Sequence, residues 1–181
     1  MKLAFVGPPA VGKDTVAAYV EKKYKLHHIS SGDLLREYVK NNNLGDFDRR
    51  NLQIAGNNLR KKMGGDILVK MAFEKVSDNL ILSGLRAIDE VKTFKKLGGI
   101  VISINAPLER RYELAKSRGR IDDNVTLDDF IKIEEEENRN PDRNSQNVDE
   151  VISMSNLEIL NDGSLDDLYS KSDELMKKIL K

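Results

Sequence analysis

The N-terminal segment joins a short apolar run, a glycine-rich loop and an amphipathic run, and no other part of the chain constrains the fold as strongly. The run KLAFV is rich in β-forming residues and ends at Gly7, and the apolar residues of KDTVAAYVEKKY recur at the spacing of one helix face. A strand that passes through a tight loop directly into a helix is typical of folds in which helices cover a parallel sheet.

The remaining sequence alternates in the same way, which predicts an α/β fold. Four further apolar runs have the length and composition of buried strands: LHHIS, NLILS, GIVISIN and LEILN. Helical patterns separate or follow them: SSGDLLREYVK, NLQIAGNNLRKKM, DILVKMAFEKV, AIDEVKTFKKL, PLERRYELAKSR, residues 126–138 and residues 164–179. In the first of these, Ser31 or Asp33 is available near the N-cap. We predict a three-layer fold with a parallel five-stranded sheet, and a single domain over residues 1–181 because no repeat or linker appears.

The composition excludes several classes of function. The chain has 181 residues, with 30 Lys and Arg against 30 Asp and Glu, so no overall charge attracts it to nucleic acid or to an anionic membrane. It contains no cysteine, which excludes disulfides, thiol catalysis and thiolate zinc sites. The N-terminal apolar run LAFV is too short for a signal peptide or a membrane span. We expect a cytoplasmic protein, a monomer or small homo-oligomer, that binds small-molecule nucleotides and neither membrane nor nucleic acid.

The loop between the first strand and the first helix has the form G-x-x-x-x-G-K, a motif that binds phosphate. In this context backbone amides point inward, the helix N-terminus adds partial positive charge, and Lys13 reaches the outer phosphates. The motif usually has Ser or Thr where Asp14 stands, and a carboxylate there repels phosphate unless a cation lies between them. The alternative is an ordinary glycine turn. The residues predicted to bind ATP are Gly7, Pro8, Pro9, Ala10, Val11, Gly12, Lys13, Asp14 and Thr15.

Two segments make the chain resemble adenylate kinase and its nucleoside monophosphate kinase relatives. The loop of that family reads G-x-P-G-x-G-K-G-T, with the threonine one place later than in most such loops, so Thr15 matches it and Asp14 replaces a glycine. The segment HISSGDLLRE is similar to the family's I-S-T-G-D-L-L-R, whose arginine holds the phosphate of the acceptor nucleotide. The resemblance implies a P-loop NTPase fold, and acceptor-binding roles for Ser31, Gly32, Asp33 and Arg36.

A third segment, LSGLRAIDE, looks like a shortened form of the family's D-G-F-P-R-T-x-x-Q. The resemblance implies that Gly84 and Arg86 bind the acceptor, with Arg86 as the second phosphate arginine. It also implies that Glu90 occupies the position that reads the acceptor base, where the family has glutamine. A helical acceptor-binding insertion is therefore expected at about residues 31–76.

A fourth segment, RGRIDDN, resembles the lid of the short-lid members of the family, which implies a lid at about residues 118–140. The family carries a further arginine on the helix of its lid, and no residue of FIKIEEEE matches it. The lid residues implied by the resemblance are Arg118 and Arg120 as phosphate-binding arginines, Asp122 and Asp123 as hinge acids, and Arg139 or Arg143 as the substitute for the missing arginine.

One departure from the family concerns the metal. The aspartate of D-G-F-P-R helps to hold the water shell of magnesium, and here Ser83 occupies its position. We hypothesise that Asp14 supplies the missing carboxylate, so that Mg²⁺ lies between Asp14 and the phosphates of ATP. The expected Mg²⁺ contacts, mostly through water, are Asp14, Thr15 and Ser83. The alternative is that Asp14 only caps the helix that begins at Lys13.

The predicted site is rich in cations that suit phosphoryl transfer. This reaction needs two anions aligned and their charge neutralised where water is excluded. No general base is required for a phosphate acceptor, because its oxygen is already ionised. Arginine is well suited to this task, since its planar fork binds phosphate in a bidentate way. The candidates for this catalytic role are Lys13, Arg36, Arg86, Arg118 and Arg120.

Some of the polar residues also have a purely structural interpretation. Arg36 could be an exposed helical residue that pairs with Glu37 or Asp33. His27 and His28 are interpreted as strand or strand-edge residues rather than catalytic ones. The acidic residues 134–137 are interpreted as a solvated helix face.

These patterns predict a P-loop kinase that transfers the γ-phosphoryl group of ATP, with Mg²⁺, to a nucleoside monophosphate. Residues 47–67 lack the usual sequence motifs of that family and resemble P-loop kinases with G-K-D-T loops, which include deoxynucleoside monophosphate kinases. Dephospho-coenzyme A or a deoxynucleotide is therefore an alternative acceptor. A nucleotide-binding switch or an RNA-associated ATPase is the alternative from another class. Arg36 and Arg86 argue against it because a hydrolase does not need them, and the balanced charge offers no basic stripe for RNA.

Overall fold

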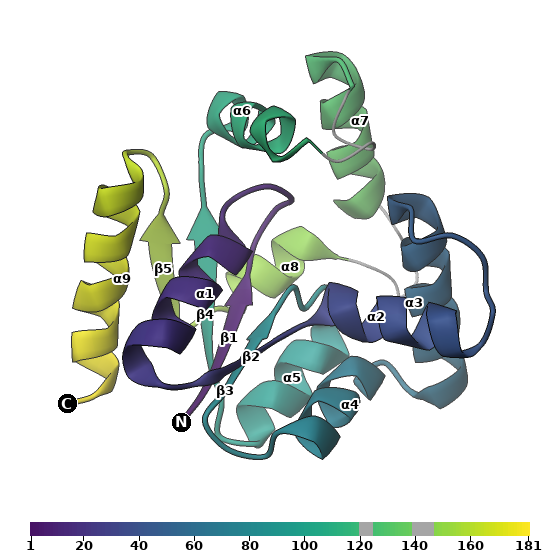
Figure 1. Cartoon of the computed structure of the whole chain (residues 1–181), viewed down its shortest axis with the longest axis horizontal. Coiled ribbons are helices and arrows are strands. Elements are labelled where there is room, and N and C mark those ends of the chain that lie inside the picture. The colour runs from purple at the N-terminus through teal and green to yellow at the C-terminus, as the bar shows by residue number, and fades with distance from the viewer. Residues whose placement is uncertain (120–124, 139–146) are drawn as a thin grey trace.

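The computed structural model describes residues 1–119, 125–138 and 147–181. Their strands form one parallel sheet (Figure 1) in the order β2-β3-β1-β4-β5. The strands are β1 (Lys2–Val6), β2 (His27–Ser30), β3 (Leu80–Ser83), β4 (Ile100–Asn105) and β5 (Leu157–Leu160). The prediction of an α/β fold with a parallel five-stranded sheet is confirmed.

Helices cover both faces of this sheet. One face packs against α1 (Lys13–Tyr24) and α9 (Leu165–Ile179). The other face packs against α2 (Ser31–Asn41), α3 (Arg49–Met63), α4 (Ile67–Lys75), α5 (Ile88–Lys96) and α8 (Val148–Ser153). Figure 1 shows α6 (Leu108–Arg118) and α7 (Leu127–Asn138) beyond the carboxyl ends of the strands. The sequence did not predict α8, because its six residues are too few to display a helical period.

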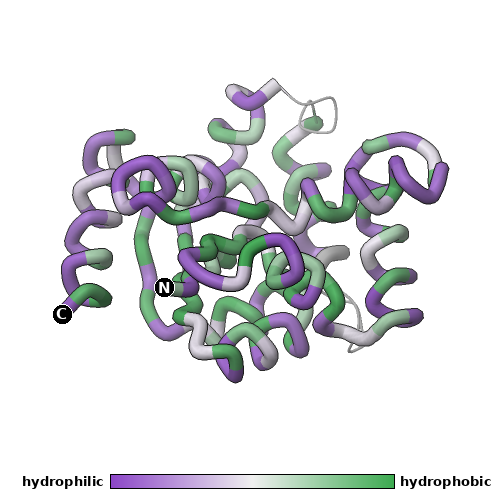
Figure 2. The backbone as a smooth tube through the Cα atoms, turned by 60° about the horizontal axis from the view of Figure 1, so that its bottom comes forward, coloured by the Kyte–Doolittle hydropathy of each residue, from purple (hydrophilic) through white to green (hydrophobic). Residues whose placement is uncertain are grey.

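The central strand β1 is buried between the two helical layers. Leu3 and Phe5 belong to the apolar cluster that includes α1 and α9, and Ala4 and Val6 belong to the cluster on the opposite face. This division follows from the alternation of side chains along a strand. Figure 2 shows hydrophobic segments running through the centre of the molecule, whereas the outer helices alternate between hydrophilic and hydrophobic residues. The loop that follows β1 therefore starts from a rigid position.

The register of the strands brings three loops together at the carboxyl edge of the sheet. Phe5 of β1 pairs with Ser83 of β3, and Ser83 pairs with Ser30 of β2. The chain segments after β1, β2 and β3 therefore begin side by side. This edge is where open parallel sheets with helices on both faces bind their ligands.

The segment after β2 enters α2 without an intervening loop. Ser30 is the N-cap of this helix, since its Oγ accepts hydrogen bonds from the amides of Gly32 and Asp33 at 3.1 and 3.3 Å. The expectation that Ser31 or Asp33 serves as the cap is wrong, because the helix starts one residue earlier than the pattern suggested. Ser31 is instead the first helical residue and is buried.

The predicted lid, residues 118–140, is described only in part. Its Arg120 and hinge acids, and both candidates for the missing lid-helix arginine, lie outside the described residues. In the described part, Arg111 of α6 donates a hydrogen bond to Glu134 Oε2 of α7 at 2.9 Å, and both side chains are largely buried. The interpretation of residues 134–137 as a solvated face is therefore wrong at Glu134, because this carboxylate joins the two helices. No helix in the described ranges has the length and apolarity to cross a membrane.

Candidate functional site

A cavity of about 870 Å³ opens at the carboxyl edge of the sheet, where the segments after β1, β2 and β3 meet. Its described lining contains six cationic side chains and three carboxylates, so it favours anionic ligands. The cations are Lys13, Arg36, Arg49, Arg60, Arg86 and Arg118, and the carboxylates are Asp14, Asp46 and Asp48.

The loop after β1 depends on glycine at two positions. Gly7 has a φ of +142°, and a Cβ atom there would lie 2.2 Å from the carbonyl oxygen of Ile104. Gly12, with a φ of +97°, is the N-cap of α1. A side chain at either position strains the backbone, and at Gly7 it also collides with β4. These glycines explain how the chain turns from a buried strand into a helix that points at the cavity.

Hydrogen bonds from Asn161 and Lys13 also hold the shape of the loop. The Val11 side chain is fully buried, and its carbonyl oxygen accepts a hydrogen bond from Asn161 Nδ2 at 3.0 Å. Lys13 Nζ folds over the loop and donates to the carbonyl oxygens of Gly7 and Pro8 at 3.0 and 2.6 Å. The loop thus has a fixed shape in which the ammonium group of Lys13 already lies above it.

The predicted ATP-binding residues divide into two groups. Pro9, Ala10, Lys13 and Asp14 line the cavity, whereas the remaining members of the loop do not. Thr15 is exposed and lies outside the cavity lining. One residue along a helix corresponds to a rotation of about 100°, so the presence of Asp14 in the lining turns Thr15 away. Thr15 therefore lies outside the lining that contains Asp14, and its contact with Mg²⁺ stays a prediction.

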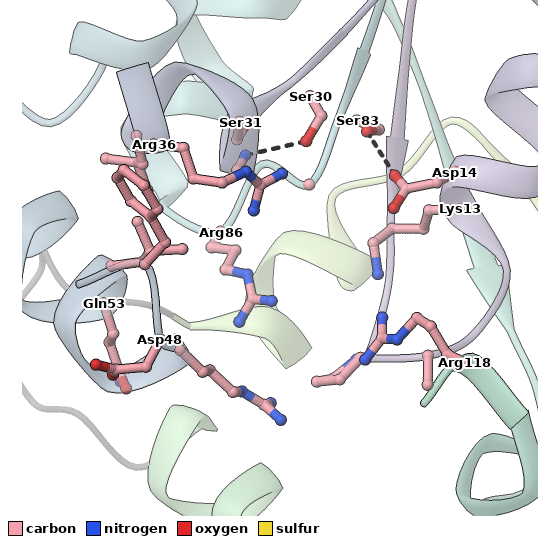
Figure 3. Close-up of a pocket in the computed structure, with 18 of the residues that line it drawn as sticks. Lys13, Asp14, Ser30, Ser31, Arg36, Asp48, Gln53, Ser83, Arg86 and Arg118 are labelled. Atoms are coloured by element: carbon pink, nitrogen blue, oxygen red, sulfur yellow. Dashed lines mark hydrogen bonds between the residues drawn. The ribbon is translucent and has the colours of Figure 1, made fainter. Parts of the chain in front are cut away.

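Asp14 and Ser83 are in direct contact, although 69 residues separate them (Figure 3). Ser83 Oγ donates a hydrogen bond to Asp14 Oδ1 at 3.0 Å. His28 Nε2 lies 2.9 Å from the same Oγ atom. The three side chains form a chain from β2 through β3 to α1. The Asp14 carboxylate at the start of α1 therefore lies beside Ser83, the position at which the adenylate kinase family has its aspartate. Its hydrogen bond comes from Ser83, and the N-cap of α1 is Gly12.

The segment HISSGDLLRE forms the next side of the cavity. Ser31, Gly32 and Arg36 line it, and Arg36 forms an ion pair with Asp33 at 2.5 Å. A Cβ atom on Gly32 would lie 3.4 Å from both terminal nitrogens of Arg36, so the small residue leaves space for this guanidinium. Ser31 is 4% exposed, and its Oγ has no hydrogen-bond partner among the described residues. A buried hydroxyl at a cavity wall is satisfied most simply by a ligand.

The segment after β3 places Gly84 and Arg86 in the lining, as expected, but not Glu90. The Glu90 side chain is 0% exposed. Its Oε1 accepts from Arg60 Nε at 2.8 Å, and its Oε2 accepts from the amides of Arg86 and Ala87 at 2.8 and 3.0 Å. Glu90 therefore lies behind the cavity wall and supports it, which corrects the expectation that it reads an acceptor base.

Arg60 is a site residue that the sequence interpretation missed. Its side chain is 1% exposed, yet it belongs to the cavity lining. A signal was present, because Arg60 follows Leu59 on the buried side of α3. A charge on the apolar face of a helix requires a counter-ion, but the sequence does not say that Glu90, 30 residues away, provides it. Arg49, at the start of the same helix, was also missed.

Arg118 reaches the cavity from the opposite side. It is the last residue of α6, and Gly119, with a φ of +66°, ends the helix. Figure 3 shows the side chains of Lys13, Arg86 and Arg118 extending toward a common space between the loop and α2. The arrangement brings together cations from three separate parts of the chain. Such a site can align two anionic groups and neutralise the charge between them.

Comparison with known proteins agrees with this geometry. The model of the AAA domain family matches residues 6–127. The UPF0200 protein of Sulfurisphaera tokodaii is 30% identical over 98% of this chain and 97% of its own length. The UPF0200/UPF0201 protein of Archaeoglobus fulgidus is 32% identical over 99% of this chain, which spans 56% of that longer relative.

Two solved structures share the fold. TT1252 from Thermus thermophilus superposes with a TM-score of 0.68 at 17% identity, covering 100% of this chain and 98% of its own. Shikimate kinase from Bacteroides thetaiotaomicron superposes with a TM-score of 0.65 at 13% identity, covering 98% of both chains. These superpositions show that the molecule has a P-loop kinase-like fold. They do not single out the adenylate kinase group within that fold.

Proposed function

We propose a phosphotransferase function for this chain, which belongs to the UPF0200 family and contains an AAA domain. It transfers the γ-phosphoryl group of ATP to a nucleoside monophosphate or a similar phosphorylated small molecule. The observation that carries this proposal is that Lys13 of the loop lines the same cavity as Arg36 and Arg86 on the facing side.

In this proposal the two sides of the cavity, the donor wall and the acceptor wall, bind different molecules. The donor wall consists of residues 7–14 and holds the phosphates of ATP. The acceptor wall consists of the cavity-lining residues Ser31, Arg36, Arg49, Arg60 and Arg86, and it holds the acceptor. A hydrolase needs only the first wall, so the cations of the second wall favour a transferase.

The donor wall acts through Lys13. Its Nζ now donates to two carbonyl oxygens of the loop, and it exchanges these partners for oxygens of the β- and γ-phosphates when ATP binds. The exchange replaces neutral acceptors by charged ones, which strengthens the hydrogen bonds. Because the ammonium group already lies above the loop, little reorganisation precedes transfer.

The acceptor wall acts through its arginines. Arg36 and Arg86 hold the phosphate of the acceptor, and Arg60, fixed by Glu90, adds a buried positive charge below them. Arg118 lies on the far side of the common space and neutralises charge on the group in transit. No residue is required to remove a proton, because the attacking phosphate oxygen is already ionised.

The residues near Lys13 fit Mg²⁺. Asp14 lines the cavity and uses Oδ1 for the hydrogen bond from Ser83, which leaves Oδ2 to accept hydrogen bonds from water in the Mg²⁺ shell. Mg²⁺ retains several waters and needs few protein carboxylates. When bound, it reduces the repulsion between Asp14 and the phosphates and offsets charge on the β- and γ-oxygens.

One observation favours an acceptor other than a nucleoside monophosphate. Glu90 holds the place of the residue that reads the base in the adenylate kinase family, and here it lies behind the wall. Phe47 and Gln53 are among the other residues of the lining, and they can contact the body of the acceptor. A dephospho-coenzyme A or deoxynucleotide type of acceptor is therefore the second candidate.

A coupled assay tests the proposal. Wild-type protein is supplied with ATP and Mg²⁺ together with each nucleoside monophosphate, deoxynucleoside monophosphate or dephospho-coenzyme A in turn, with ATP alone as the control. We expect one acceptor class to raise ADP formation well above the control, and Lys13→Ala to abolish the increase. ADP formation that is the same with and without every acceptor would identify an ATPase and contradict the proposal.

A further inference from the structure

The hydrogen-bonded chain from His28 through Ser83 to Asp14 has a role that the sequence did not indicate. We propose that His28 is a positioning residue that fixes the orientation of the Asp14 carboxylate toward Mg²⁺-ATP. The inference rests on the proposed function, because it concerns the side of Asp14 that faces the bound nucleotide. The test measures binding of an ATP analogue rather than turnover.

The donors and acceptors of Asp14, Ser83 and His28 determine which atom carries each proton. A serine hydroxyl has one proton to donate and two lone pairs to accept with. An ionised carboxylate only accepts, so the Ser83 proton is committed to Asp14 Oδ1. The nitrogen atom 2.9 Å on the other side of Ser83 Oγ must then donate, which means that His28 Nε2 carries a proton. A histidine with its proton on Nδ1 alone would place two acceptors against each other.

Ser83 is 1% exposed, so its hydroxyl has no access to bulk solvent that could replace a missing donor. If His28 Nε2 does not donate, Ser83 Oγ keeps its bond to Asp14 but is held from one side only, so the direction of that bond is less restricted. Asp14 itself is exposed at the cavity, where water competes for its oxygens. The half-buried His28 and the buried Ser83 therefore influence the geometry at the exposed end of the chain.

Strand pairing also makes His28 and Ser83 rigid. His28 pairs with Ile81, and Ser83 pairs with Ser30, in the parallel register of β2 and β3. The amide of His28 also donates to Glu21 Oε1 of α1 at 2.8 Å. His28, Ser83 and the helix that carries Asp14 thus belong to one packed unit. A carboxylate oriented in this way has lost its rotational freedom before Mg²⁺-ATP arrives, which lowers the entropy cost of binding.

The test compares substitutions at His28 that keep or remove the donor. The glutamine side chain carries its amide nitrogen the same number of bonds from Cα as His Nε2, so His28→Gln keeps a donor near the right place. His28→Leu fills similar space without a donor. His27→Leu, one residue earlier on β2 and exposed, is the matched control. Calorimetry then measures the Mg²⁺ concentration that half-saturates binding of a non-hydrolysable ATP analogue.

We expect His28→Leu to raise this Mg²⁺ concentration roughly 5-fold, the effect of one lost hydrogen bond, whereas His28→Gln and His27→Leu stay within about 2-fold of wild type. Ser83→Ala removes the bridge and should give the same shift as His28→Leu. Combining the two substitutions should add nothing further, because both break one chain.

The proposal is wrong if His28→Leu has the Mg²⁺ requirement of wild type, if His28→Gln shifts it as much as leucine does, or if the effects of His28→Leu and Ser83→Ala add. Should His28→Leu fail to fold, Ser83→Ala and His28→Gln still decide, since the first must shift the requirement and the second must not. Failure of wild-type protein to bind the analogue at all would overturn the proposed function itself, and this inference with it.

Discussion

The donor and acceptor walls of the cavity are built by different means. The donor wall is a continuous stretch of eight residues whose shape comes from backbone conformation, with positive φ at Gly7 and Gly12. The acceptor wall is assembled from side chains on α2, α3 and the segment after β3, and a buried carboxylate holds two of these parts together. The shape of the donor wall therefore depends mainly on its glycines, while its function depends on the side chains of Lys13 and Asp14. The acceptor wall depends on both partners of its buried ion pair even for its shape.

The largest expected effect tests the support of the acceptor wall. Glu90→Gln leaves the Arg60 charge buried without a counter-charge, and we expect a loss of about 3 to 5 kcal/mol in the free energy of unfolding. Adding Arg60→Met should recover much of this loss, because it removes the uncompensated charge. Urea denaturation measures both variants, with Glu174→Gln on the exposed side of α9 as a control within about 0.5 kcal/mol of wild type. A loss below 1 kcal/mol for Glu90→Gln would mean that the ion pair does not support the wall.

The next effect tests the donor wall. Lys13→Ala removes a charged donor from the transferring phosphate, and we expect turnover to fall by about 100-fold or more. The free energy of unfolding should stay near that of wild type, since the Lys13 ammonium is only part-buried and donates to two carbonyl oxygens of its own loop. Lys22→Ala, on the exposed side of the same helix, serves as the matched control. Near-normal turnover of Lys13→Ala would show that ATP binds elsewhere.

A smaller effect tests whether the two walls are independent. Arg36→Ala and Arg86→Ala each remove charged hydrogen bonds to the acceptor, so we expect the KM for the acceptor to rise about 10-fold or more. The affinity for an ATP analogue, measured by calorimetry, should change by less than about 2-fold. If either variant loses affinity for the analogue and for the acceptor equally, that arginine belongs to the donor wall and the division proposed here is incorrect.

The smallest effect concerns Asp14 of the donor wall, where it contacts Ser83 at the end of β3. Asp14→Asn keeps the shape and removes the charge, so we expect the Mg²⁺ concentration for half-maximal turnover to rise by roughly 3- to 10-fold. Asp14→Gly should be partly rescued by Ser83→Asp, which returns a carboxylate to the same contact. If Asp14 only stabilises its helix, the variants lose about 0.5 to 2 kcal/mol in the free energy of unfolding, and their Mg²⁺ titrations overlap that of wild type.

The same difference between the walls explains what the sequence could predict. The donor loop and the alternation of strands and helices that gives a parallel five-stranded sheet follow from local patterns, and the motif located Lys13 in the cavity. The order of the strands was not predicted, because it depends on contacts between segments far apart in the sequence. Glu90 was assigned to the wrong side of the wall because its partners, Arg60 and two backbone amides, are set by packing between α3 and α5. The sequence indicated only a strand or strand-edge residue at His28. It could not show the contact with Ser83, because that residue lies 55 positions away on another strand.

The central claim is that one cavity holds ATP on the donor wall and a second phosphorylated molecule on the acceptor wall. Following the label from ATP labelled at the γ-phosphate tests it most directly, with wild-type protein, Mg²⁺ and the panel of phosphorylated acceptors. The account predicts that the label appears covalently in one class of acceptor, and that Arg86→Ala loses this product while it still binds the ATP analogue. Label that appears only as inorganic phosphate with every acceptor would contradict the account.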